Sequence, residues 1–463
     1  MLPLRVSWLN LTGWPPRRGA ALALLTLGSA ARAGAQAVTP PSPPPRVLQD
    51  DLDLQARSNV VEGSGARALG MGGAFLARAD DATAASWNPA GLSYLRRPEV
   101  SLVWAPVNSL DSLERDISGN PVSNDQRWGS TPDFAAFTYP VAFRSVTGAA
   151  QISFQRVIAF AGDRTIDTPG TDREVTSSGG FDVLALGSGL QVTRAVRLGF
   201  TVNRWLNGYD QSRFSELNRG STRQDVSFKL SGWNANFGVI VSPWQSLNLG
   251  AKADTPFTAK VDLARTRVDT VGDVATFNGY ESDAVRLDFP GAIGVGASWR
   301  PRSVLTVSAD YTLTFWSSGQ IHNFFTLPRT IPGQLPQPPQ APTDVFGTLP
   351  YPSLYDTSGL GQTNTQQIRF GGEYVLIGHR LKIPLRAGFF LDRQYFRALD
   401  GRPPTFTGLT AGTGVILGPV LLDAAYVYEF GDYDSLDVSG NQLHNTVRSH
   451  RLYLSLIYRH GGS

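Results

Sequence analysis

Apolar and polar residues alternate with a period of two through most of the chain after residue 98. The clearest run covers residues 305–315, where every odd position is apolar or aromatic and every even position is Thr, Ser or Asp. A period of two places successive side chains on opposite faces of a strand. A run of about eleven residues is also long enough to cross a bilayer as a tilted strand. The pattern therefore predicts strands with one apolar face and one polar face.

Similar runs recur about fourteen times along the chain. In one of them the apolar phase of residues 226–230 changes after Gly232 to the opposite phase of residues 233–241, which predicts a β-bulge at Gly232. The runs lie at residues 99–106, 132–140, 146–160, 180–192, 195–209, 226–241, 246–260, 284–299, 303–317, 366–377, 382–397, 405–417, 419–432 and 446–459.

The links between these runs alternate between short and long. Bacterial outer-membrane barrels have an even number of strands, short periplasmic turns and longer outer loops, whereas a soluble β-sandwich would not sort its links in this way. The prediction is an all-β fold, a transmembrane antiparallel β-barrel of about 14 strands over residues 99–463 in the outer membrane of a Gram-negative cell. The long polar links lie at residues 107–131, 161–179, 210–225, 261–283, 318–365 and 433–445.

The first 37 residues predict a secretory signal peptide. Arg17 and Arg18 precede a short apolar stretch at residues 20–27, and small residues suitable for cleavage follow. These 37 residues hold four Arg and no acidic residue, so their removal changes the formal net charge from +3 to −1. The charge of the mature chain therefore gives no reason to expect a nucleic-acid partner. The Pro-rich residues 38–60 are expected to form an extended tether.

Composition excludes several kinds of chemistry. The chain of 463 residues has no cysteine, which excludes disulfides, thiolate catalysis and Cys-based metal sites. Its five histidines show no ligand spacing, so neither a metal site nor a cofactor is expected. No Gly-x-Ser-x-Gly elbow occurs, and a catalytic site is not expected. Asp80 and Asp81 could form a carboxylate pair for catalysis or Ca²⁺, but a polar surface is the expectation for them.

Residues 63–92 are rich in Gly and Ala and end in the turn-forming tetrapeptide Asn88-Pro89-Ala90-Gly91. This stretch closely resembles the N-terminal hatch of the FadL/TodX family of outer-membrane transporters for hydrophobic compounds, and also that of PorV-type barrels of a secretion system. Residues 61–98 are accordingly predicted to form a hatch that plugs the barrel lumen. Phrases within the later strands, such as residues 288–290 and 423–428, resemble the FadL side.

The resemblance implies a monomeric barrel whose lumen is closed by the hatch. Hydrophobic molecules, such as long-chain fatty acids or aromatic hydrocarbons, would bind from outside and pass by diffusion, and an inward kink in an early strand would open a side exit into lipid. A Gly-rich plug suits a gate because its loops carry little side-chain bulk. The residues assigned to the hatch and its gating are Gly70, Gly72, Gly73, Asn88, Pro89, Ala90 and Gly91.

Aromatic residues near the outer ends of the predicted strands are candidates for contact with a hydrophobic ligand. We assign Phe75, Phe214, Phe324 and Phe325 to substrate binding. For the last three, an interfacial aromatic belt and an apolar capture groove both remain open interpretations, as they do for Trp205 and Tyr209.

Charged residues within the predicted strands are expected to pair in the lumen, with a contact to a ligand carboxylate as the alternative; they are Arg156, Arg204, Asp310, Arg369 and Arg386.

Two functions are compatible with the sequence. The first is passive, gated transport of hydrophobic compounds, with a hydrophobic small molecule or lipid and the outer-membrane bilayer as partners. The alternative is a PorV-like shuttle or structural partner in protein secretion. The long Pro-rich link at residues 318–365 would serve as a lid in the first function and as a protein-binding loop in the second.

Overall fold

The computed structural model describes residues 63–143, 146–160, 162–168, 171–217, 220–272, 274–282, 285–322, 348–350, 363–379, 381–436 and 441–461. The chain divides into two units, Met1–Ser42 and Pro43–Ser463, and every described residue belongs to the second unit. The predicted signal peptide at residues 1–37 and the predicted tether at residues 38–60 lie outside the described residues.

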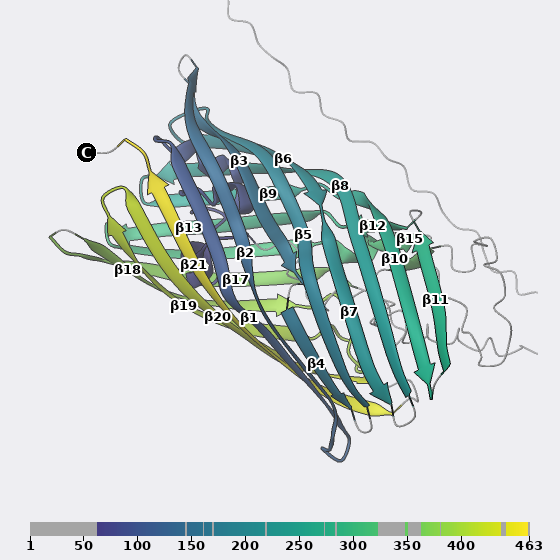
Figure 1. The fold of residues 1–463 in the computed structure, drawn as a ribbon. Coiled ribbons are helices and arrows are strands. Elements are labelled where there is room, and N and C mark those ends of the chain that lie inside the picture. The colour runs from purple at the N-terminus through teal and green to yellow at the C-terminus, as the bar shows by residue number, and fades with distance from the viewer. Residues whose placement is uncertain are drawn as a thin grey trace, which may run out of the picture. The chain divides into compact units, whose positions relative to one another are not determined.

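The strands form a closed antiparallel barrel of 14 crossings, as the sequence pattern predicts (Figure 1). Each strand pairs with its neighbours, and the last strand pairs with the first, which closes the ring. Ten crossings are single strands: β1 (Glu99–Asp116), β2 (Pro121–Phe143), β5 (Thr171–Gln191), β8 (Gly220–Trp244), β14 (Leu305–Thr314), β17 (Thr365–Ile377), β18 (Lys382–Arg393), β19 (Thr405–Leu417), β20 (Val420–Leu436) and β21 (Gln442–Arg459).

The other four crossings consist of two or three consecutive strands. Between β14 and β17, the structure also describes the short helix η2 (Trp316–Ser318) and two short strands, β15 (Gln320–His322) and β16 (Thr348–Pro350). The divided crossings are β3 (Val146–Ala159) with β4 (Gly162–Thr168), β6 (Val196–Leu206) with β7 (Gly208–Leu217), β9 (Leu247–Asp254) with β10 (Phe257–Val271), and β11 (Val274–Ser282) with β12 (Arg286–Phe289) and β13 (Ala292–Arg302).

The alternation along β14 separates its two faces as predicted. Val307 and Tyr311 point outward and are 40% and 38% exposed, whereas Ser308 and Asp310 point into the barrel and are 6% and 4% exposed. The barrel is therefore apolar on its outer face and polar on its inner face at this level, the reverse of a soluble sandwich.

The predicted β-bulge at Gly232 is wrong. On one edge of β8, Lys229 lies opposite Gly208 of β7 and Gly232 lies opposite Trp205 of β6, which is one unbroken register. On the other edge the register changes by one residue between Ser231 opposite Lys260 and Asn236 opposite Asp254, and the extra residue belongs to the β9–β10 crossing and not to β8. Even-numbered residues of β8 face inward on both sides of Gly232, so Phe228 and Leu230 are buried inside the barrel while Trp233 is exposed outside. The apolar phase changes because the interior itself becomes apolar at this level, and the backbone continues as one regular strand.

Most of the predicted long links are strands rather than loops. The β1–β2 pairing continues through the predicted link at residues 107–131, from Asn108 opposite Gly129 to Arg115 opposite Pro121. Similar extensions occupy the links predicted at residues 161–179, 210–225 and 261–283. These sections are rich in polar residues, and their apolar residues lie partly inside, as Val261 and Leu263 do, and partly outside, as Phe277 does. They therefore lack the alternation that marks a strand against an apolar medium. Much of the link at residues 318–365 lies outside the described residues.

Residues 63–95, called here the N-terminal segment, pack within the ring of strands. The segment contains α2 (Ala66–Gly70), α3 (Ala84–Trp87) and η1 (Pro89–Tyr94), drawn in purple in Figure 1. None of the helices in the described part of the chain is long and apolar enough to span a membrane. The segment ends just before β1, at the same end of the barrel as the short turns, such as residues 245–246 between β8 and β9.

Candidate functional site

The N-terminal segment is attached to the barrel wall by hydrogen bonds on several sides of the ring. The backbone N–H of Ala66 donates to Ser455 Oγ on β21 at 2.8 Å, and that of Gly72 donates to Thr410 Oγ1 on β19 at 2.9 Å. Gln151 on β3 donates from Nε2 to the carbonyl of Ala82 at 2.7 Å. The segment is therefore held across the lumen, because its partners lie on widely separated strands.

Asp310 on β14 holds the middle of the segment. Its Oδ2 accepts the backbone N–H groups of Phe75 at 2.6 Å and Leu76 at 2.8 Å. Both donors lie outside any helix, so the carboxyl group supplies the acceptor that the local backbone does not. Asp310 is thus a wall residue that binds the N-terminal segment.

The Asn88-Pro89-Ala90 turn contacts the wall at β8 and β9. Asn88 Nδ2 donates to the carbonyl oxygens of Leu76 at 2.9 Å, Val239 on β8 at 3.2 Å and Ala251 on β9 at 3.3 Å. Its Oδ1 accepts the N–H of Ala90 at 3.1 Å, which caps η1. The side chain therefore links the turn, the preceding loop and two strands.

Glycines on the inner face of the barrel leave room for the backbone of the segment. We call them the glycine collar. At six of these positions an added Cβ atom would lie 2.0–2.6 Å from an atom of the segment, closer than real Cβ atoms essentially ever come, and at Gly412 it would lie 3.0 Å from Gly70 Cα. The segment can approach so closely only because these wall positions carry no side chain. The glycine collar consists of Gly189, Gly199, Gly238, Gly250, Gly371, Gly388 and Gly412.

A network of charged side chains joins the segment to β17. Arg67 Nη1 lies 2.8 Å from Asp80 Oδ1, and Arg78 Nη2 lies 2.9 Å from Glu373 Oε1 on β17. Arg386 on β18 also binds Glu373, at 2.9 Å. Burial raises the pKa of Asp80, but the guanidinium groups of Arg67 and Arg78 outweigh that effect and hold this pKa below its ordinary value.

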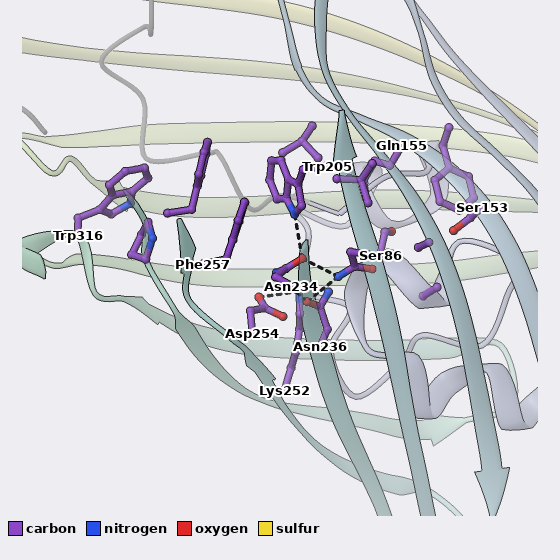
Figure 2. A pocket seen from close by; sticks show the side chains of 18 residues that line it. Ser86, Ser153, Gln155, Trp205, Asn234, Asn236, Lys252, Asp254, Phe257 and Trp316 are labelled. Carbon is purple, nitrogen blue, oxygen red and sulfur yellow. Dashed lines mark hydrogen bonds and ion pairs between the residues drawn. The ribbon is translucent and has the colours of Figure 1, made fainter. Parts of the chain in front are cut away.

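A cavity lined by aromatic rings, called here the aromatic cavity, lies on one side of the N-terminal segment (Figure 2). The rings of Phe257 and Phe289 stack with centroids 4.9 Å apart, and that of Trp205 lies 5.0 Å from Phe289. Apart from the segment's Ala85 and Ser86, the lining residues are Phe134, Ser153, Gln155, Val157, Val183, Ala185, Asn203, Trp205, Asn234, Asn236, Lys252, Asp254, Phe257, Phe289, Pro290 and Trp316.

Polar side chains gather at one end of the aromatic cavity, as Figure 2 shows. Trp205 Nε1 donates to Asn234 Oδ1 at 2.8 Å, Asn203 Nδ2 donates to the same oxygen at 3.0 Å, and Lys252 Nζ lies 3.1 Å from Asp254 Oδ2. These groups satisfy one another, which leaves the rings as the surface for an apolar molecule. The cavity volume is about 60 Å³, smaller than the ~150 Å³ of an apolar cavity that binds benzene, so a ring-sized ligand must displace side chains.

The third crossing is interrupted beside the aromatic cavity. β3 pairs with β2 as far as Gln155 opposite Phe134, and β4 resumes the pairing at Asp163 opposite Trp128. Between these pairs the third crossing has two residues more than β2, so its pairing with β2 is interrupted there. Phe160, which lies in this interruption, is buried in the same aromatic cluster as Trp205.

The structure places the residues assigned to the hatch and its gating together inside the ring. Gly72 and Gly73 have φ angles of 67° and 71°, and Gly70 lies against Gly412 of the wall. Gly91 approaches Ala79 so closely that an added Cβ would lie 1.8 Å from its carbonyl oxygen. Asn88, Pro89 and Ala90 form the turn described above. Whether these residues act in gating stays a prediction.

The four residues assigned to substrate binding are not brought together. Phe75 is fully buried inside the N-terminal segment, with its ring 6.1 Å from that of Trp87, and is not among the residues that line the aromatic cavity. Phe214 lies on β7 and is 43% exposed. Phe324 and Phe325 lie outside the described residues.

The strand-interior charges divide between the two faces. Arg156 binds Asp182 at 2.8 Å, and Arg386 binds Glu373, both as expected for lumen charges. The expectation is wrong for Arg204, because its neighbours Asn203 and Trp205 on β6 face inward and it points outward, with its guanidinium 5.2 Å from the Trp233 ring. Asp310 and Arg369 also face inward; Asp310 binds the N-terminal segment, and Arg369 lies over Trp87.

Sequence reasoning missed the residues that build the aromatic cavity and the glycine collar. The sequence alone leaves Trp205 and Tyr209 open between an interfacial belt and an apolar groove, and the structure buries both inside the barrel. A signal for the collar is present in the sequence, since several predicted strands carry a glycine near the middle, as in residues 187–189 and 371–372.

Together, the closed ring of 14 crossings, the internal segment and the apolar lumen cavity define a β-barrel with an occupied lumen. The structure is similar to a Pseudomonas aeruginosa FadL homologue, with 17% identity, a TM-score of 0.59 and coverage of 86% of this chain and 99% of that chain. It is similar to the Ralstonia pickettii toluene transporter TbuX, with 16% identity, a TM-score of 0.58 and the same coverages. The P. putida toluene transporter TodX gives 14% identity and a TM-score of 0.58, again over 86% and 99%.

No protein-family model and no curated protein matches the sequence. The likenesses to solved structures are below 25% identity and define the fold. The chain has the FadL/TodX-type barrel fold, and the resemblance noted in its sequence is confirmed at that level.

Proposed function

We propose that this protein is an outer-membrane transporter that passes hydrophobic compounds by passive diffusion. The observation that carries the proposal is an aromatic cavity inside a barrel that is apolar on its outer face and crossed by an internal segment. The FadL homologue and the toluene transporters share this fold, which supports the same class of ligand here. The barrel would act as a monomer in the bilayer, with no catalytic step.

A molecule with a single aromatic ring is the ligand that fits the proposal best. The stacked rings of Phe257 and Phe289 and the indole of Trp205 offer flat apolar faces at spacings typical of aromatic packing. Burial of one ring between them would contribute about 1.5–3 kcal/mol before ordering costs. Slender alkyl chains, such as those of fatty acids, would use the same apolar surface.

The N-terminal segment is proposed to act as the hatch. The glycine collar and the hydrogen bonds that the segment's N–H groups donate to Asp310 and Thr410 hold the backbone of the segment closely against the wall. A segment seated in this way would block straight passage through the lumen. The proposed gate is therefore a local movement of residues such as Gly72 and Gly73, whose conformations few other residues adopt.

The proposed exit is sideways, through the interruption between β2 and the third crossing. Phe134 and Gln155, the last pair before the interruption, both line the aromatic cavity, as does Val157 just beyond them. Once the gate has admitted a ligand to the rings, the ligand would meet this part of the wall on its way out. Such a path would deliver an apolar molecule to the lipid, where it is soluble.

The PorV-like shuttle is not the function we propose. Its sequence support was the long link at residues 318–365, and most of that link lies outside the described residues. A shuttle would also have no use for an apolar cavity deep in the lumen.

A matched pair of substitutions tests the proposal. Ala185→Trp should fill the aromatic cavity, whereas Leu186→Trp should leave it open because Leu186 points outward and is 64% exposed. Uptake of radiolabelled toluene into cells that lack other such transporters should fall to background with Ala185→Trp and stay near wild type with Leu186→Trp. Equal uptake by both variants would refute transport through this cavity.

A further inference from the structure

A second cavity lies on the other side of the N-terminal segment from the aromatic cavity. On β9, Asn248 lines the second cavity, Gly250 lies against the segment, and Lys252 lines the aromatic cavity. These residues are successive inward positions of one strand, so the segment separates the two cavities. The second cavity has a volume of about 670 Å³ and includes Ser303, in the short turn between β13 and β14.

Basic side chains dominate this second cavity, which we call the basic cavity. Eight basic residues line it against three acidic ones. Half of the basic residues are engaged in ion pairs: Arg67, Arg78 and Arg386 bind Glu373, and Arg459 binds Glu99. The pairs of Arg67 and Arg78 join the segment to β17, whereas those of Arg386 and Arg459 join neighbouring strands of the wall.

The other four basic residues are Arg96, Arg97, Arg300 and Lys382. Arg96 donates hydrogen bonds to side chains of the wall. All four are exposed, and within the residues that the structure describes none of them forms an ion pair, although the charge of Arg300 also acts on Asp80. Two further carboxylates, Asp81 and Asp423, are already bound to Arg67 and Arg386. The basic cavity thus keeps an excess of positive charge after every described pairing is counted.

One wall of the basic cavity is apolar. Val375 and Ile377 on β17, Pro384 on β18, Ile416 on β19 and Leu421 on β20 form it, from four neighbouring strands. Lys382 stands directly beside this wall, because it is the cross-strand partner of Ile377. An apolar surface and an unpaired cation therefore lie next to each other in the same cavity.

We propose that the basic cavity is a binding site for an amphipathic organic anion. The oxyanion group, a carboxylate or a phosphate, would be bound by Lys382 and Arg300, and a short apolar body would lie against the β17–β20 wall. Guanidinium and ammonium groups without protein partners bind such oxyanions well. A simple rim of solvated cations would not require an adjoining apolar wall. The site is separate from the aromatic cavity, so this inference goes beyond the proposed transport function.

The test is binding of octanoate to the purified protein in nanodiscs of zwitterionic lipid, measured by calorimetry against empty nanodiscs. Octyl phosphate tests the second oxyanion head, 1-octanol has the chain without the charge, and inorganic phosphate has the charge without the chain. The variant is Arg300→Gln with Lys382→Gln. Its control is Arg194→Gln with Arg302→Gln, which removes the same charge from two exposed positions that do not line the basic cavity, one in the turn after β5 and one at the end of β13.

In the Ala185→Trp variant, whose filled aromatic cavity no longer takes alkyl chains, octanoate or octyl phosphate should bind at least about tenfold more tightly than 1-octanol and inorganic phosphate. The difference between octanoate and octyl phosphate identifies the preferred oxyanion group. Arg300→Gln with Lys382→Gln should lower that affinity about tenfold or more, while the control pair should change it less than twofold. Equal binding of octanol, or equal loss in both double variants, would overturn the proposal. Loss of octanoate binding with Ala185→Trp alone would also overturn it, because the anion would then occupy the aromatic cavity and the transport proposal would stand.

Discussion

Replacing Gly371 by alanine should loosen the N-terminal segment, while the same change at Gly372 should not. A Cβ at Gly371 would lie 2.0 Å from the carbonyl oxygen of Met71, which belongs to the backbone of the segment and has no side-chain freedom to yield. A Cβ at Gly372 would meet only the carbonyl oxygen of Thr306, at 3.6 Å, an ordinary contact. Neither glycine has a positive φ, so alanine fits both backbones.

The free-energy cost of the Gly371→Ala contact can be estimated from the usual penalty for overpacking. Forcing an extra methyl group into a filled site costs about 1–3 kcal/mol, which corresponds to about a 5- to 150-fold increase in the population of the released segment. Hydrogen–deuterium exchange of a peptide covering residues 66–76 measures this population directly. Exchange should accelerate by that factor in Gly371→Ala and stay at the wild-type rate in Gly372→Ala. Equal rates in the two variants would show that the segment is not seated on the glycine collar.

Three further changes should report on the segment and the aromatic cavity. Asp310→Ala should speed exchange of the Phe75 and Leu76 amides about tenfold, because both donors lose their acceptor, and Asp310→Asn should have a smaller effect because its Oδ1 still accepts. The pKa of Asp80 is lowered in the folded protein, so its contribution to the stability of the segment is fully present above about pH 4 and is lost as the pH falls further. Protection of the segment's amides from exchange, measured from pH 8 to pH 3, should show this loss in the wild type and lack it in Asp80→Asn. Phe289→Ala should weaken toluene binding about 2- to 13-fold in a titration of the purified protein, through loss of the stacked ring, and unchanged affinity would exclude this ring from the site.

The crossings of the barrel could be predicted because a strand between an apolar exterior and a polar interior must alternate. The same rule failed at Gly232. The lumen becomes apolar around Phe228 and Leu230, so the inward side chains of this strand are apolar, as only outward side chains are in most other strands. It also failed for the hairpin extensions such as residues 107–131, since polar residues on both faces carry no period. Those strands continue only because their backbones pair with neighbouring strands, and the sequence does not reveal that pairing.

The site was less accessible from sequence than the fold. The Asn88 turn and the glycines of the N-terminal segment could be found because they are contiguous and resemble a known hatch. Trp205, Phe257 and Phe289 come from three separate crossings, and only the register of the barrel brings their rings together. The same holds for the glycine collar. A single glycine within a strand predicts no contact, and only the structure shows that these glycines all lie where the N-terminal segment meets the wall.

A structure of the protein soaked with bromobenzene would test the central claim most directly, because the anomalous signal of bromine locates the ligand without ambiguity. The account predicts a bromine peak in the aromatic cavity, between the rings of Trp205, Phe257 and Phe289. Peaks confined to the outer face of the barrel, with none in the lumen at saturating ligand, would contradict it.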